Sequence, residues 1–178
     1  MSHLSVYAED APERPILETA DAARIAEALG EIGVRFERWP THDADGDALT
    51  IYADEIARLQ AAGGYQSVDV ISLAPDHPDR AALRQKFLSE HRHTEDEVRF
   101  FVEGEGLFTL HEGGRVWNAL CTKGDLIAVP GGMRHWFDMG PSPRFTAIRL
   151  FINPDGWVAH FTGDDIADRF PRHEPALA

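Results

Sequence analysis

The feature that most constrains this chain is a set of three histidines and one glutamate spaced like the ligands of a single metal ion. His91 and His93 are two residues apart, Glu97 follows shortly after them, and His135 belongs to a distant segment. Residues i and i+2 of a β-strand point to the same face, so the first two imidazoles can converge. Glu97 can join them through a bend, and His135 must then lie on a strand next to the first. The fold has to bring these strands together.

The donor set predicts the kind of metal. Imidazole nitrogens suit Fe, Ni, Cu or Zn, and a mixed nitrogen and oxygen set argues against a closed thiolate zinc site. Three nitrogens and one oxygen leave a six-coordinate ion with two adjacent open positions. A substrate that binds through two atoms can fill both of them.

The segments around the histidines indicate a mostly β protein. Aromatic and branched residues alternate with turns rich in glycine and proline, a pattern typical of a barrel or sandwich. We expect strands over residues 98–103, 106–111, 116–120, 125–129, 135–139 and 145–152. Pro130 and the two glycines after it predict a tight turn that delivers His135 opposite the first pair.

The remaining residues predict flanking elements of one domain that spans residues 1–178. Helical periodicity covers residues 21–29, 47–61 and 78–87, a strand is expected over 67–73, and residues 1–17 are expected to be extended. We divide the chain into N-terminal helices and first strands (1–88), a metal-binding barrel core (89–153) and a C-terminal tail (154–178). Part of the tail should pack, and residues 171–178 should fray.

Composition excludes several classes of protein. The formal net charge of −13 disfavours nucleic-acid binding, which needs a basic face. No apolar run is long enough for a membrane span, and the N-terminus lacks the pattern of a signal peptide. Cys121 is the single cysteine, so no internal disulfide can form, and we expect it to be a small buried side chain. These features lead us to expect a cytoplasmic protein.

Two motifs resemble those of the cupin superfamily, whose fold is a small double-stranded β-helix. The first, H-x-H-x(3,4)-E-x6-G, is matched by His91, His93, Glu97 and Gly104. The second, G-x5-P-x-G-x2-H, is matched by Gly124, Pro130, Gly132 and His135. The chain departs from the pattern at Gln85, where cupins have a glycine, and lacks their asparagine after the last histidine. Neither departure affects a proposed ligand.

Within that superfamily the chain resembles the acireductone dioxygenases of methionine salvage. The resemblance is carried by residues 87–106, 129–140 and 145–151, and it extends over nearly the whole chain. It implies a jelly-roll-like cupin barrel with a few flanking α-helices, mainly N-terminal. It also implies one Fe(2+) or Ni(2+) ion per chain, held by His91, His93, Glu97 and His135.

The resemblance further implies a substrate and products. The substrate is the acireductone 1,2-dihydroxy-3-keto-5-methylthiopentene, which reacts with O2. The iron form is expected to give 2-keto-4-methylthiobutyrate and formate. The nickel form is expected to give 3-methylthiopropionate, formate and carbon monoxide.

Arg99 is the candidate catalytic residue outside the ligand set. It lies two residues after Glu97, so on a strand it shares the face of that ligand. The metal, Glu97 and Arg99 together carry a charge of about +2, which matches a substrate dianion and lowers the substrate's pKa. The resemblance links this arginine to formation of the dianion. A surface arginine paired with Glu97 or Asp96 is the alternative.

Further residues are expected to support the ligands or to line a substrate pocket. The resemblance associates Glu90 and Asp96 with conformational change and metal loading, and either carboxylate could accept the second N–H of a ligand histidine. A substrate pocket is expected from Phe87, Phe101, Phe137, Arg149 and Trp157, although aromatic residues at such spacing are usually core. We expect most histidines outside the motif to be surface residues: His3, His42, His77, His111, His160 and His173.

Two alternatives stay open. The chain could be another cupin dioxygenase or a cupin isomerase, or it could be a non-enzymatic cupin that binds a small molecule. Arg99 and the text around His135 favour the acireductone dioxygenase. We expect a monomer whose partners are the small-molecule substrate and O2, without nucleic acid or membrane.

Overall fold

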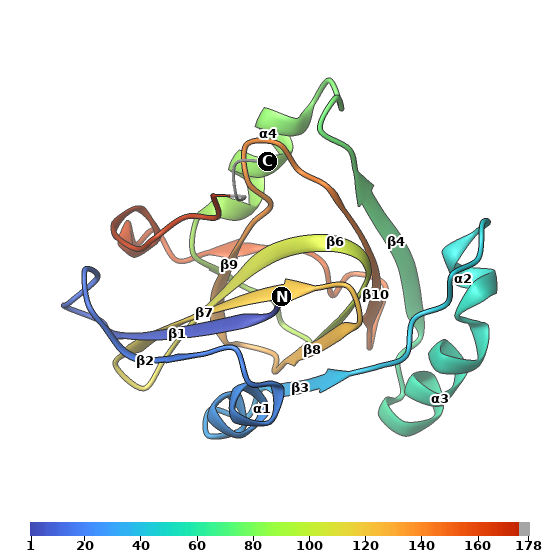
Figure 1. Cartoon of the computed structure of the whole chain (residues 1–178), viewed down its shortest axis with the longest axis horizontal. Coiled ribbons are helices and arrows are strands. Elements are labelled where there is room, and N and C mark those ends of the chain that lie inside the picture. Colours follow the sequence, from blue (N-terminus) through green and yellow to red (C-terminus); the bar gives the residue numbers. More distant parts are fainter. Residues whose placement is uncertain (175–178) are drawn as a thin grey trace.

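Two antiparallel sheets that share one long strand form the body of the protein (Figure 1). The structure is a computed structural model, and it describes residues 1–174. One sheet has the order β11–β5–β9–β6–β7–β1–β2 and the other β4–β10–β6–β8–β3. The strands are β1 (His3–Ala8), β2 (Pro15–Thr19), β3 (Arg35–Arg38), β4 (Ser67–Leu73), β5 (His91–Arg92), β6 (Glu97–Glu112), β7 (Arg115–Thr122), β8 (Asp125–Val129), β9 (Arg134–Asp138), β10 (Phe145–Phe151) and β11 (His160–Phe161). The mostly β fold predicted from the sequence is confirmed.

Strand β6 passes through both sheets because it bends at Gly104. Its first half pairs with β8 and β10, and its second half pairs with β7 and β9. Gly104 has a φ of 68°, and a Cβ there would lie 1.8 Å from the carbonyl oxygen of Arg144. The prediction of two strands separated by a turn at residues 104–106 was therefore wrong. The glycines bend one continuous strand instead of ending it.

The helices flank this body, mainly on the N-terminal side. They are α1 (Ala22–Gly30), α2 (Ala48–Ile51), α3 (Ala53–Gly63) and α4 (Arg80–Leu88), and η1 (Ile166–Arg169) is a 3-10 turn. Asp21 caps α1 by accepting a hydrogen bond from the amide of Arg24 at 2.8 Å. The helix predicted over 47–61 is divided at Tyr52, whose buried ring packs edge-on against Phe100 of β6. Helix α4 leads directly into β5.

The N-terminal and C-terminal segments are more ordered than the sequence indicates. The expected extended lead-in forms β1 and β2, which add two strands to the edge of a sheet. In the tail, His173 is buried and its amide donates to Asp138 at 2.9 Å, so the expected fraying is wrong for this residue. The same expectation for residues 175–178 lies outside the described residues.

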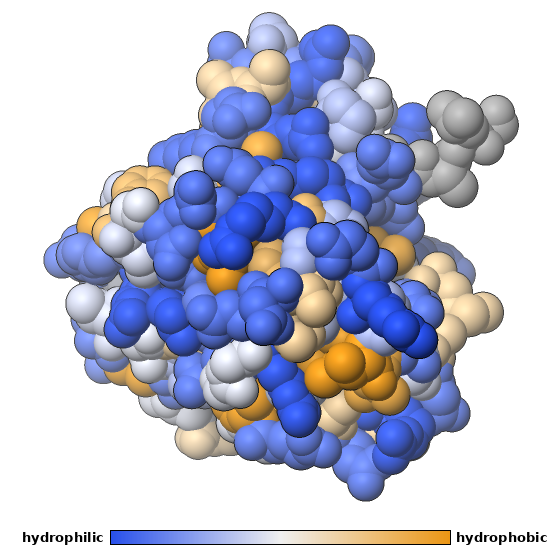
Figure 2. Space-filling model, turned by 90° about the vertical axis from the view of Figure 1, so that its left-hand side faces the viewer, coloured by the Kyte–Doolittle hydropathy of each residue, from blue (hydrophilic) through white to orange (hydrophobic). Residues whose placement is uncertain are grey.

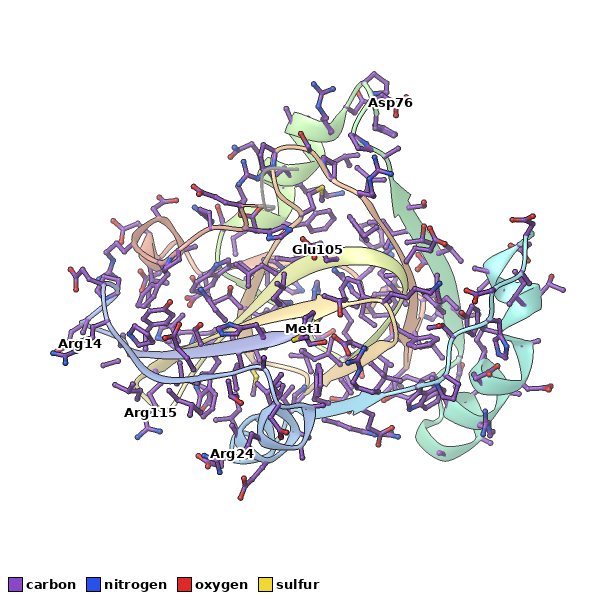
Figure 3. The ribbon with its side chains drawn as sticks, in the orientation of Figure 1. Met1, Arg14, Arg24, Asp76, Glu105 and Arg115 are labelled. Atoms are coloured by element: carbon purple, nitrogen blue, oxygen red, sulfur yellow. The ribbon has the colours of Figure 1, made fainter. Side chains whose placement is uncertain are left out.

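The barrel interior is filled by side chains from both sheets (Figure 3). The largest cluster joins aromatic residues of β6, β7, β9 and β10, and the buried Cys121 belongs to it. Hydrophilic residues predominate on the face shown in Figure 2, with smaller hydrophobic patches among them. Among the described residues, no helix has both the length and the apolar character that crossing a membrane requires.

Candidate metal centre

Three histidines meet inside the barrel, next to the bend of the chain between β5 and β6. His91 of β5 lies directly opposite His135 of β9, and His93 follows immediately after β5. All three are buried, and their candidate ligand atoms lie within 4.8 Å of one another. The strand register therefore brings together residues that are far apart in the sequence.

Backbone carbonyls fix the orientation of all three rings. The Nδ1 atoms of His91, His93 and His135 donate to the carbonyl oxygens of Ser89, Val158 and Met133, at 2.7, 3.0 and 2.9 Å. A neutral imidazole that carries its proton on Nδ1 has a lone pair on Nε2. The three Nε2 atoms are thus left as acceptors, which is the state that metal binding requires.

The surroundings keep two of the rings neutral. Burial lowers the pKa of His135 to about 3, and burial also lowers the pKa of His91. His93 is also affected by burial, but the neighbouring Glu97 carboxylate outweighs it and raises the pKa of His93. Neutral rings are available as ligands without first losing a proton.

Glu97 supplies an oxygen beside the histidines. Burial tends to raise the pKa of Glu97, but the Arg99 guanidinium and the histidines hold it well below its ordinary range. Its Oε1 accepts from Arg99 at 2.7 Å. Its buried Oε2 lies 3.2 Å from Nε2 of His93 without hydrogen-bond geometry, and it has no other partner among the described residues. A buried carboxylate oxygen without a donor is costly unless a cation occupies the space before it, so the four side chains fit a metal ion.

Arg99 is buried and only partly paired. Its Nη2 donates to Glu97, but its Nε and Nη1 have no hydrogen-bond partner among the described residues. The guanidinium carbon lies 4.6 Å from the ring centre of Phe137 and 5.2 Å from that of Phe108. Two aromatic faces and one carboxylate therefore fix the guanidinium, while two of its nitrogens stay free to bind an anion.

Glu90 and Asp96 do not hold the ligand rings. All three Nδ1 atoms go to backbone carbonyls, so the idea that either carboxylate accepts a ring N–H is wrong. Asp96 instead accepts the amide of Gly131 at 2.7 Å and thereby supports the turn before His135. Glu90 is buried against His111.

The predicted pocket residues fall into two groups. Phe87, Arg149 and Trp157 line a cavity of about 370 Å³ between α4, β4 and β10. Arg149 lies opposite Arg99 in the strand register, and its guanidinium is paired with Asp69 at 2.7 and 2.9 Å. Phe101 and Phe137 do not line this cavity and belong to the main core.

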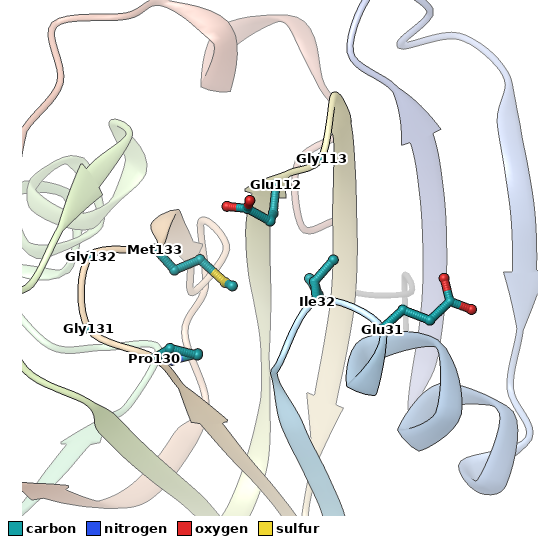
Figure 4. Close-up of a pocket in the computed structure, with 8 residues that line it drawn as sticks. All are labelled: Glu31, Ile32, Glu112, Gly113, Pro130, Gly131, Gly132 and Met133. Carbon is teal, nitrogen blue, oxygen red and sulfur yellow. The ribbon is translucent and has the colours of Figure 1, made fainter.

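A second cavity, of about 580 Å³, lies beside the turn before His135 (Figure 4). Its walls include Pro130, Met133 and two carboxylates, Glu31 and Glu112. The two carboxylates point away from each other in Figure 4, so they do not form a cation site.

The sequence predicted that part of the C-terminal tail packs, but not that the tail contacts the histidines. Residues 153–163, here called the strap, run along the segment that carries the first histidines. Val158 accepts from His93, β11 pairs with β5, and the ring of Phe161 lies 5.7 Å from that of His91. His111 was expected at the surface but is buried. The only signal for the strap is the apolar character of Trp157 and Phe161, which is equally typical of core residues.

Comparisons with known proteins agree with this geometry. Residues 3–159 match the ARD/ARD' family. The acireductone dioxygenase of Synechococcus sp. strain PCC 6301 is 58% identical over 96% of this chain and 98% of its own length. That of Stenotrophomonas maltophilia strain K279a is 55% identical over 100% of both chains.

A solved structure gives the same result for the fold. The acireductone dioxygenase from Bacillus anthracis, which has a cadmium ion in its active centre, superposes with a TM-score of 0.78. It is 31% identical and covers 90% of this chain and 98% of its own. The expected cupin barrel is confirmed by this match. The chain therefore belongs to the ARD/ARD' family, that of the acireductone dioxygenases.

Proposed function

We propose that this chain is an Fe(2+)- or Ni(2+)-dependent dioxygenase that cleaves 1,2-dihydroxy-3-keto-5-methylthiopentene with O2 in methionine salvage. One ion per chain would be held by His91, His93, Glu97 and His135. The observation that carries the proposal is the orientation of the three rings, whose Nδ1 atoms are all occupied by backbone carbonyls. The ligand atoms of these three buried rings lie within 4.8 Å of one another, and the unpaired Oε2 of Glu97 lies beside Nε2 of His93 at 3.2 Å.

Arg99 explains how the site binds an electron-rich substrate. An enediol must lose protons before it can react with O2, and positive charge nearby favours the ionised form. The free Nε and Nη1 of Arg99 can donate to the oxygens on which this charge develops. Because the guanidinium is already fixed by Glu97, Phe108 and Phe137, it needs little reorganisation.

The bound ion would supply a Lewis acid that stabilises negative charge on the substrate. The protein's own part is to exclude water from the substrate oxygens. Phe108 stacks on the ring of His135 with centroids 5.4 Å apart, and Phe161 and Val158 of the strap contact the rings of His91 and His93. A dry site strengthens each charge interaction within it.

The cavity lined by Phe87, Trp157 and Arg149 is our candidate for the methylthio end of the substrate. Its volume of about 370 Å³ suffices for a short thioether chain, and its walls include two aromatic rings. Arg99 and Arg149 are direct neighbours across β6 and β10, so the cavity adjoins the reacting end. Phe101 and Phe137 support Arg99 from the core in this proposal.

The test is to prepare metal-free protein, load it with Fe(2+) or Ni(2+), and add acireductone and O2. Loss of the enediol's ultraviolet absorbance should require the metal and should be absent from the His135→Ala variant. Product analysis should give 2-keto-4-methylthiobutyrate and formate with iron, and 3-methylthiopropionate, formate and carbon monoxide with nickel. Decay at the same rate with and without metal would refute the proposal.

A further inference from the structure

A buried imidazole and a buried carboxylate form a pair outside the proposed ligand set. His111 of β6 and Glu90, just before β5, are each only 1% exposed. Nδ1 of His111 donates to Oε2 of Glu90 at 2.5 Å. Two buried polar side chains this close are a strong, specific contact, and each would be costly to leave unpaired.

Glu90 joins this pair to the strap. Its Oε1 accepts from Oγ1 of Thr162 at 2.7 Å, and its backbone carbonyl accepts from the amide of Thr162 at 3.1 Å. One carboxylate thus bridges β6 of the barrel and the end of the strap. The residue after Glu90 is His91, so the bridge is attached to the start of the ligand segment.

The strap contacts this segment along its length. Asn153 donates to Glu95 at 2.9 Å, Val158 accepts from His93, and Phe161 and His160 pair with His91 and Arg92. The hydrogen bonds between Thr162 and Glu90 are the last of these contacts along the strap. Among the contacts named here, only the hydrogen bond between Glu90 and His111 connects the strap and the ligand segment to the long strand β6.

We infer that His111 is a positioning residue for the metal centre: by holding Glu90, it keeps the strap seated on His91 and His93. The inference rests on the proposed ligand set. If the hydrogen bond to Glu90 is lost, the end of the strap keeps its pairing with β5 but loses the contact that ties it to β6. The carbonyl of Val158, which orients the ring of His93, then becomes less well fixed. Substituting outer hydrogen-bond partners of metal ligands typically weakens metal affinity by about 10–100-fold.

The outer end of the pair faces solvent through Glu9. Oε2 of Glu9 lies 3.1 Å from Nε2 of His111, without hydrogen-bond geometry, and the side chain of Glu9 is 49% exposed. The contact that matters in this inference is therefore the inner one, from Nδ1 to Glu90. Only a side chain that donates from the Nδ1 position can replace it.

The experiment compares two substitutions of similar size. In His111→Asn the side-chain NH2 takes the place of Nδ1–H and can still donate to Glu90, whereas His111→Leu cannot. Ni(2+) affinity is measured by competition with a chelator, and hydrogen exchange is followed in peptides that cover residues 158–162. His111→Leu should weaken Ni(2+) binding about 10–100-fold and speed exchange in the strap. His111→Asn should restore both to within about threefold of the parent protein.

Thr162→Val provides an independent variant, because its side chain is exposed and its loss should not prevent folding. It should speed exchange in residues 158–162 and weaken Ni(2+) binding less than His111→Leu does. The inference is overturned if the Leu and Val variants keep the parent's exchange rates and Ni(2+) affinity, or if Asn fails to restore them. If the parent protein binds no Ni(2+), the ligand set fails instead, and strap exchange alone then tests the role of His111.

Discussion

Arg99 is held in place but not saturated with hydrogen bonds, and this combination makes it the most informative single residue of the site. Buried arginines are normally paired through most of their N–H groups, because an unpaired buried donor is costly. Here two nitrogens of the guanidinium have no partner among the described residues. Unpaired N–H groups of this kind are what we expect of an arginine that binds an anionic ligand.

The corresponding prediction is that Arg99→Met retains the metal but loses activity. Methionine fills the space between Phe108 and Phe137 but offers no charge to the enediolate. We expect kcat to fall by about 10²–10³-fold, as for other losses of a fixed charge-stabilising donor. Steady-state kinetics and elemental analysis of the metal check this. Arg24→Met, in an exposed ion pair on α1, is the control and should leave kcat unchanged. Full activity in Arg99→Met would remove the proposed role.

At this scale the sequence predicted the residues that share a motif and failed for those defined only by tertiary partners. His91, His93 and His135 have a spacing that strand geometry explains, and the structure brings them together. The pairing of His111 with Glu90 has no such spacing, because it depends on how β6 passes the start of β5. Burial of a polar residue can be inferred only when its partner is known.

Among single elements, the bent strand β6 matters most for the candidate site. Glu97 and Arg99 lie before the bend, and the segment paired with His135 lies after it. The sequence around Gly104 predicts a turn, because glycines with positive φ serve turns and bends equally well. Only the pairing of both halves with other strands shows that the strand continues. Strands β4 and β8, which lack such glycines, were predicted with the bounds that the structure has.

We predict that Gly104→Ala destabilises the protein far more than Gly113→Ala. Both glycines have positive φ, of 68° and 62°, but a Cβ at Gly113 meets nothing within 4 Å. Gly113→Ala should therefore lower the free energy of unfolding by about 1–2 kcal/mol, the usual effect of a left-handed backbone. Gly104→Ala should lower it by about 3 kcal/mol or more, because the methyl group also overlaps the Arg144 carbonyl. Urea unfolding monitored by fluorescence measures both. Equal losses would show that the bend is not sterically fixed.

Asp138 ties three elements together, and its ionisation should make stability depend on pH. It accepts hydrogen bonds from Arg84 of α4 at 2.7 and 3.0 Å, and from the amides of Gly140 and His173. Burial tends to raise its pKa, but these donors outweigh burial and lower it. The stabilisation that ionised Asp138 contributes is therefore fully present above the pKa of an unfolded aspartate, about 3.9. It is lost as pH falls through the lower folded value.

Asp138→Asn should accordingly lower the free energy of unfolding by about 1–3 kcal/mol at neutral pH. The difference from the parent protein should stay constant above about pH 5 and shrink on acidification below about pH 4. Denaturant unfolding of metal-free protein from pH 3 to pH 7 measures it. Asp165→Asn, whose side chain is 82% exposed, is the control and should show no such difference. If the difference in free energy of unfolding between the parent protein and Asp138→Asn grows on acidification, ionised Asp138 is not the source of the stabilisation.

For the whole molecule, the metal should couple the two sheets into one more stable unit. The proposed ligands come from β5, β6 and β9 and the bend between β5 and β6, so an ion bound to the folded chain favours folding. At about 100-fold excess over Kd, the gain is about 2.7 kcal/mol, or about 5–10 °C in Tm for a chain of this size. Calorimetry with Ni(2+) and with excess chelator measures the shift. His91→Ala should abolish it, and the same shift in that variant would place the ion elsewhere.

The most direct test of the account is anomalous X-ray diffraction at the nickel edge from crystals of Ni(2+)-loaded protein. We predict a single strong peak per chain, bounded by Nε2 of His91, His93 and His135 and by a carboxylate oxygen of Glu97. Two neighbouring positions around the ion should hold only water or substrate. A peak outside this group, or an ion fully enclosed by protein ligands, would contradict the proposed centre.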